Sequence, residues 1–245
     1  HLADPIIGPN SAPPTSPLVV EVTSTLGDSG TYQPDTTVFT GTNQNIPNAA
    51  LLQLAYRSIR VAQTAGTATW NLATGRVLPN DLVVSSGTLN LNARAVGVTG
   101  NFRTEATGAL QMISAADSPG VTGNVTFGGA GTSGLLTNGT ITLNGSFTQS
   151  GSANSFAPSG THRTKFRGAT AQNITFANST ASFFHRMEVN AAGRAVTLQS
   201  NATVNDSLTM FGGGSQSILN GGGTTQRLRV LGGIRMTQEA LSPLL

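Results

Sequence analysis

The sequence predicts an all-β protein, and a parallel β-helix (a β-solenoid) is the architecture that fits it best. Three observations lead to this prediction: short runs of alternating apolar and polar residues, a glycine-centred unit at a near-constant spacing, and few charges. Charged residues make up 9% of the 245 positions, against about 25% in an average globular protein. A solenoid whose backbone hydrogen bonds run from one turn to the next needs few charged residues.

Alternating runs rich in Thr, Val, Leu and Ile occur along most of the chain and are typical of half-buried strands. The clearest are residues 89–92, 141–144, 187–189, 196–198, 228–230 and 234–236, and residues 19–25 predict a first strand. Only residues 48–57 fit a helix, with Asn48 as its cap. A loop with one helical turn fits this segment equally well.

A five-residue unit recurs as VTGNF at 98–102, VTGNV at 121–125 and LNGSF at 143–147. Divergent copies are VNDSL at 204–208 and VLGGI at 230–234. The central residues Gly100, Gly123 and Gly145 lie 23 and 22 residues apart, which suits one turn of a parallel β-helix with ~4.8 Å between turns. Nine or ten such turns would fit residues 31–238. Uneven strand lengths also allow a β-sandwich, but the constant step favours the solenoid.

In such a solenoid, inward Val, Ile, Leu and Phe side chains stack in apolar columns, and outward Thr, Asn and Ser form ladders along the axis. The repeat places Phe102, Phe147, Phe166 and Leu208 in equivalent slots. We therefore expect these four side chains to point inward on one stacked face.

A longer duplication links two parts of the chain. TVFTGTNQNI at 37–46 aligns with TKFRGATAQNI at 164–174 once Thr170 is treated as an insertion, and residues 55–61 match residues 183–189. We expect one solenoid domain over residues 19–245, built from two divergent copies at about 37–112 and 164–236. Residues 1–18 hold five of the eleven prolines and predict an extended arm or linker.

Residues 145–189 (GSFTQSGSANSFAPSGTHRTKFRGATAQNITFANSTASFFHRMEV) and 196–208 resemble repeats of very large bacterial surface and secreted proteins. The shared pattern is G-N-F-T-Q-S-G, F-x-G-x-x-Q-x-I, F-x-N-L-x-V and V-T-L-x-S-x-x-T-V-x-G-x-L. Arg186 and Met187 stand where that family tends to have Asn and Leu. The resemblance implies an extracellular β-helix stalk of an adhesin or filament, with no shared catalytic residues.

No set of residues predicts an enzyme, a metal site or a cofactor. Residues 27–30 (GDSG) resemble a serine-protease nucleophile loop, but His162 and His185 lie downstream and the other motifs of that class are missing. The ten acidic residues are single and far apart, whereas a glycosidase needs two converging carboxylates. A carbohydrate-active enzyme is kept as an alternative, as is a module that binds polysaccharide.

The basic residues give a net charge of only +3 and are spread along the chain, so we expect no nucleic-acid partner, because a duplex binder needs a dense basic face. The densest basic run is Arg163, Lys165 and Arg167, which alternate and would line one outward strip. Either this strip is a solvated strand face, or it contacts an acidic surface glycan or a neighbouring subunit. The sequence contains no run of 18 apolar residues, so it predicts no membrane-spanning helix.

The ends of a β-helix leave backbone groups unpaired and can add strands. We therefore expect a homopolymer joined end to end, located outside the cell or at its surface. The candidate subunit contacts in the arm and first strand are Ile6, Ile7, Leu18, Val19 and Val20, which would fill grooves of the next copy as in strand addition. A linker to a further domain is the alternative for the arm.

Overall fold

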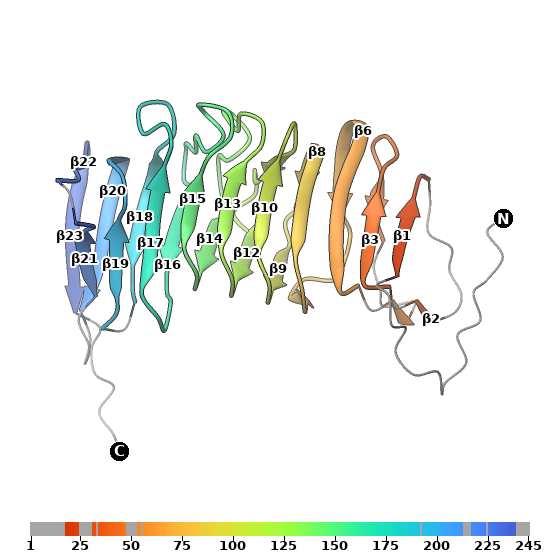
Figure 1. Cartoon of the computed structure of the whole chain (residues 1–245), viewed down its shortest axis with the longest axis horizontal. Helices are drawn as coiled ribbons and strands as arrows, with labels where there is room; N and C mark the ends of the chain where they lie inside the picture. The colour runs from red at the N-terminus through yellow and green to blue at the C-terminus, as the bar shows by residue number, and fades with distance from the viewer. Residues whose placement is uncertain are drawn as a thin grey trace, which may run out of the picture.

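The computed structural model is a parallel β-solenoid of about eight turns, with no helix among the residues that it describes (Figure 1). It describes residues 18–24, 31–32, 34–47, 53–54, 56–191, 193–212, 217–223 and 225–238. Every strand pair is parallel. A β-sandwich is made of antiparallel sheets, so the solenoid is confirmed and the sandwich is not favoured.

The larger sheet has 12 strands and runs the length of the solenoid. Its main path is β1 (Val19–Val22), β3 (Thr36–Phe39), β6 (Ser58–Trp70), β8 (Leu82–Asn90), β10 (Phe102–Glu105), β13 (Val125–Gly128), β15 (Phe147–Gln149), β17 (Gln172–Phe176), β19 (Ala195–Leu198) and β21 (Ile218–Gly221). The two remaining strands, β4 (Asn45–Ile46) and β11 (Ala109–Gln111), pair with β6 and β8.

The second sheet has nine strands. They are β7 (Arg76–Leu78), β9 (Ala95–Val98), β12 (Ser118–Val121), β14 (Thr140–Leu143), β16 (Arg163–Phe166), β18 (Phe184–Val189), β20 (Ala202–Gly212), β22 (Leu228–Val230) and β23 (Gly233–Gln238). A third, small sheet pairs β2 (Thr31–Tyr32) with β5 (Gln53–Leu54).

These elements test the strand predictions directly. All six clearest alternating runs coincide wholly or in part with strands, and the first strand covers Val19–Val22 of the predicted residues 19–25. A continuous helix over residues 48–57 is wrong, because Gln53–Leu54 form β5. Residues 48–52, like the GDSG segment at 27–30, lie outside the described residues.

The length of a turn follows the repeat in the middle of the solenoid and departs from it elsewhere. Phe102 lies beside Val125 and Val125 beside Phe147, as the spacing of the repeat glycines predicts. The next step, from Phe147 to Ile174, is longer, because the corner between β16 and β17 is longer than the corner between β14 and β15. About eight turns form rather than the predicted nine or ten, because the second sheet begins only at β7 and its path has eight strands.

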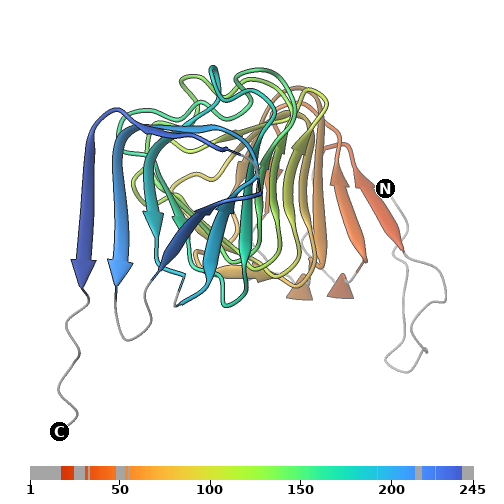
Figure 2. The same ribbon diagram turned by 60° about the vertical axis from the view of Figure 1, so that its left-hand side comes forward.

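The inward side chains make one apolar core enclosed by the two main sheets (Figure 2). Phe102, Phe147, Phe166 and Leu208 are all buried within it, as predicted. The prediction of one stacked face is wrong, because Phe102 and Phe147 share a column of the larger sheet, while Phe166 and Leu208 occupy two different columns of the second sheet.

The cause lies in where each repeat unit falls. VTGNF at 98–102 bridges the corner between β9 and β10, whereas VNDSL at 204–208 lies inside the long strand β20.

A polar ladder runs along the corner that contains the repeat units. The Oδ1 atom of Asp81 accepts the backbone N–H of Asn101 at 2.7 Å, and Asn101 and Asn124 repeat this bond to the turn that follows, at 2.9 and 2.8 Å. Gly123 is needed at this corner, since a Cβ atom there would lie 2.4 Å from the carbonyl oxygen of Gly100. The predicted ladder of outward polar residues is confirmed at this corner.

The two aligned segments 37–46 and 164–174 build corners with the same hydrogen bonds. Gly41 donates its N–H to Oε1 of Gln44 at 3.0 Å, and Gly168 donates to Oε1 of Gln172 at 2.9 Å. Each buried glutamine then donates from Nε2 to backbone carbonyls of the preceding turn. One corner follows the larger sheet and the other the second sheet, so the division into two copies stays a prediction.

Candidate functional site

The first turn exposes apolar side chains at one end of the solenoid. Of the candidate subunit contacts, Leu18 and Val19 are exposed, and Val20 packs partly against the core. Among the described residues, β1 pairs only with β3, so its other edge is open. Ile6 and Ile7 lie outside the described residues.

The last turn exposes apolar side chains at the opposite end. Ile234 is 64% exposed and Met236 is 76% exposed, yet they stand beside Leu208 and Met210 in rows that point into the core. Figure 2 shows this end in front, with β23 as its outermost strand in the second sheet. No described residue covers these two side chains, although their alternation in the sequence predicts a half-buried strand.

Charge is distributed unevenly along the axis. Residues 1–56 contain four acidic residues and no Lys or Arg, whereas residues 163–238 contain eight Lys and Arg against Glu188 and Asp206, a net charge of +6. The overall surplus of +3 therefore comes from the last turns, and the rest of the chain is weakly acidic. Among the described residues, Glu21 and Asp35 lie in the first turns, so the stacking of turns separates them from the basic residues of the last turns.

The predicted basic strip lies on the outer side of β16, and much of its charge is compensated. Nη1 of Arg163 lies 3.4 Å and Nζ of Lys165 lies 3.2 Å from the two carboxylate oxygens of Glu188 on the neighbouring strand β18. The Glu188 side chain is only 9% exposed. Arg167 is exposed and forms no ion pair with any described residue, so it keeps its full charge toward solvent.

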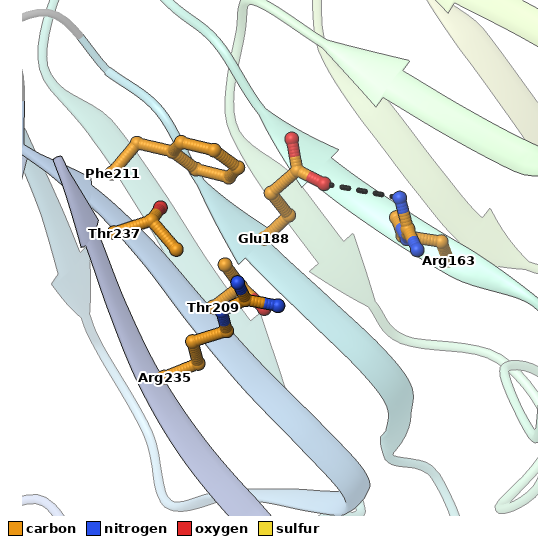
Figure 3. A pocket seen from close by; sticks show the side chains of 6 residues that line it. All are labelled: Arg163, Glu188, Thr209, Phe211, Arg235 and Thr237. Carbon is orange, nitrogen blue, oxygen red and sulfur yellow. Dashed lines mark hydrogen bonds and ion pairs between the residues drawn. The ribbon is translucent and has the colours of Figure 1, made fainter. Parts of the chain in front are cut away.

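A shallow groove of about 270 Å³ opens beside this strip, on the outer side of the second sheet (Figure 3). It is lined by Arg163, Glu188, Thr209, Phe211, Arg235 and Thr237. Glu188, Thr209 and Arg235 form one outward row over three successive strands. Figure 3 shows Phe211, Thr237 and Arg235 on one side of the groove and Arg163 on the other, with Glu188 between them. Sequence reasoning missed Phe211 and Arg235 as partners, because they lie two and three strands of this sheet away from Arg163.

Two titratable side chains outside the groove, His162 and Asp206, have structural partners. His162 is fully buried, and this burial lowers its pKa to about 4. Its Nδ1 atom lies 3.0 Å from the carbonyl oxygen of Asn138. Asp206 accepts a hydrogen bond from Nε of Arg186 at 2.5 Å. Neither arrangement joins a nucleophile to a base.

Within the described part of the chain, no group of three or more His, Asp or Glu side chains could hold a metal ion. The same residues include no helix long and apolar enough to cross a membrane. Comparison of the chain with family models, with curated proteins and with solved structures finds no match. The resemblance of residues 145–189 to bacterial surface repeats thus agrees with the β-helix fold, and the origin that it implies stays a prediction.

Proposed function

We propose that this protein is a structural β-helix module of a bacterial surface fibre, filament or adhesin, located outside the cell and assembled end to end. The observation that carries the proposal is the last turn. Ile234 and Met236 occupy inward rows and are nevertheless exposed. Apolar side chains in such rows become buried when a further layer stacks on them, and in an end-to-end assembly a second copy supplies that layer.

The backbone supports the same arrangement. β1 and β21 are the two outermost strands of one parallel sheet, at opposite ends of the solenoid. When the register of this sheet is carried through all its strands, Val19 of a second copy lies beside Asn220, and Val20 lies beside Gly221. Pairing these two edges satisfies backbone groups that an open sheet edge leaves unpaired.

The charges favour a head-to-tail contact over a contact between two like ends. Among the described residues, the first turns carry Glu21 and Asp35 before any Lys or Arg, and residues 194–238 carry four Arg side chains against Asp206. Opposite potentials steer two partners into one orientation, and like potentials oppose the other. Because such steering is screened by salt, assembly is expected to slow as ionic strength rises.

We propose no enzymatic activity and no cofactor. The best-placed carboxylates of the outer face, Glu188 and Asp206, each form ion pairs with Arg or Lys side chains. A general acid or nucleophile in glycoside cleavage needs a second carboxylate at a defined distance, and the partners of these two are cations.

Light scattering after size-exclusion chromatography tests the assembly. The intact chain should form species of several times the mass of one chain, and Met236→Lys should reduce them to single chains, because it places a charge at the stacking face. Ile113→Lys is the matched control, since Ile113 is also exposed but lies on a middle turn; it should assemble as the intact chain does. A single-chain mass for the intact protein, or equal masses for the two variants, contradicts the proposal.

Deletion of residues 1–18 tests the role of the arm. If the arm lies along the next copy, the shortened chain should form smaller species than the intact chain at equal concentration. An unchanged number of chains per assembly would show that the arm takes no part in the contact.

A further inference from the structure

We propose that the groove on the outer side of the second sheet binds a segment of an acidic glycan, through Arg163, Arg235 and the ring of Phe211. This inference does not depend on end-to-end assembly. The groove lies on the outer side of the second sheet (Figure 3) and reaches β23, the strand that also carries the stacking residues. Arg235 and Thr237 alternate along this strand with Ile234 and Met236, so they face the opposite side.

The first step of the argument is the charge left over in the groove. Glu188 forms ion pairs with both Arg163 and Lys165, so these three side chains together retain one positive charge. Arg235 is exposed and has no ion pair or hydrogen bond to a described residue. Two Arg side chains therefore present guanidinium groups that can bind carboxylate or sulfate by two parallel hydrogen bonds.

The second step is the distance between these cations. Arg163 lies on β16 and Arg235 on β23, which are separated by β18 and β20. Three strand spacings correspond to roughly 14 Å. The two Arg side chains therefore come from strands three spacings apart, and an oligomer whose acidic groups are separated by neutral units can reach both of them.

The third step distinguishes a glycan from a chain of phosphates. Phe211 is one of two Phe residues outside the core, which holds eight of the ten Phe side chains. Its ring at the groove wall offers a flat apolar surface to the C–H face of a sugar. Glu188 can accept hydrogen bonds from the hydroxyl groups of a neutral sugar unit, which a chain of phosphates lacks. The hydroxyl groups of Thr209 and Thr237 can serve a sugar as donors or acceptors.

Isothermal titration with a hyaluronan hexamer, in which acidic and neutral sugars alternate, tests the proposal at low ionic strength. The intact chain should show saturable binding at one site, and neutral maltohexaose should bind much more weakly because it leaves both Arg side chains without an anion. Arg235→Ala and Phe211→Ala should each weaken binding about tenfold or more, the loss expected for one charged hydrogen bond or one well-packed aromatic contact.

Arg103→Ala is the matched control, because Arg103 is a half-exposed Arg on the outer side of the other sheet and its removal changes the net charge equally. It should bind as the intact chain does, and circular dichroism should show the same fold for all variants. The proposal is overturned if the hexamer does not bind, if Arg103→Ala weakens binding as much as Arg235→Ala, or if polyphosphate binds more tightly and Phe211→Ala has no effect.

Discussion

The inner turns and the last turn of this solenoid use the same inward rows with opposite results. Leu208 is 3% exposed, and Ile234, the next residue in its row, is 64% exposed. Val189 is fully buried, and Met236, two turns further along its row, is 76% exposed. The residue types are equally apolar, so residue type does not cause the difference.

The comparison shows that an inward side chain is buried by the turns on both sides of it. A solenoid gains its stability from contacts between neighbouring repeats, and its end repeats need a cap. Within the described residues, the last turn has a neighbour on one side only. Its apolar row is therefore left uncovered, and this is the physical basis of the proposed end-to-end assembly.

The largest effect is expected from a substitution in the middle of the solenoid. Phe166 is fully buried and packs edge-to-face on Phe184, with 5.7 Å between ring centroids. Phe166→Ala should lower the free energy of unfolding by ~3–5 kcal/mol, because it removes the ring and leaves a cavity. Urea unfolding followed by circular dichroism measures this loss, and a change below ~1 kcal/mol would contradict the burial of this row.

Acid should also act on the middle turns. Burial lowers the pKa of His162 to about 4, below the value of about 6.5 expected in the unfolded chain. The unfolded chain therefore binds the proton first, and stability should be complete above pH 6.5 and fall by about 3 kcal/mol as the pH drops from 6.5 to 4.

The measurement is urea unfolding at a series of pH values. His162→Gln should remove most of the pH dependence in this range. A His162→Gln profile that keeps the slope of the intact chain would contradict the assignment to this residue.

A smaller effect is expected at the glycine corner of the middle turns. A Cβ atom at Gly123 would lie 2.4 Å from a backbone oxygen that cannot move away without breaking the ladder. Gly123→Ala should cost roughly 1–3 kcal/mol in the free energy of unfolding. Gly120→Ala provides the control, because nothing lies within 4 Å of a Cβ atom there; equal losses at both positions would argue against this corner geometry.

The smallest effect is expected at the last turn. In a dilute sample of single chains, Met236→Ala should change the free energy of unfolding by less than ~0.5 kcal/mol, because the side chain is already largely exposed. The same unfolding experiment as for Phe166→Ala gives the comparison. A loss as large as that of a buried Met would mean that some part of the chain covers this row.

Most of the fold could be predicted from the sequence, and less of the arrangement of side chains on the surface. Alternation and the near-constant step between glycines predicted parallel turns, and the glycine-centred units predicted a corner with a polar ladder. The five-residue repeats could not show whether a given repeat bridges a corner or lies inside a strand, because VTGNF and VNDSL share the same pattern of apolar and polar residues. Only the pairing of strands reveals it, and this pairing places Leu208 inside β20, beside Met187.

The groove could be predicted only in part. Arg163 and Lys165 were placed on one outward strip from their alternation, and the structure adds that Glu188 compensates them. Phe211 and Arg235 join them only through the stacking of later strands, for which single-sequence patterns carry no signal. The axial charge difference did have a signal in the sequence, because no Lys or Arg precedes Arg57.

The most direct test of end-to-end stacking uses the absence of cysteine from the chain. Continuing the register of the larger sheet places Val19 of one copy beside Asn220 of the next. Neighbouring strands lie ~4.8 Å apart, within the range of about 4.4–6.8 Å that a disulfide spans between Cα atoms. The double variant Val19→Cys, Asn220→Cys should give a ladder of covalent multimers on a non-reducing gel after mild oxidation. A variant combining Val19→Cys with Arg103→Cys should give no such ladder, and the same pattern for both variants would contradict head-to-tail stacking through β1 and β21.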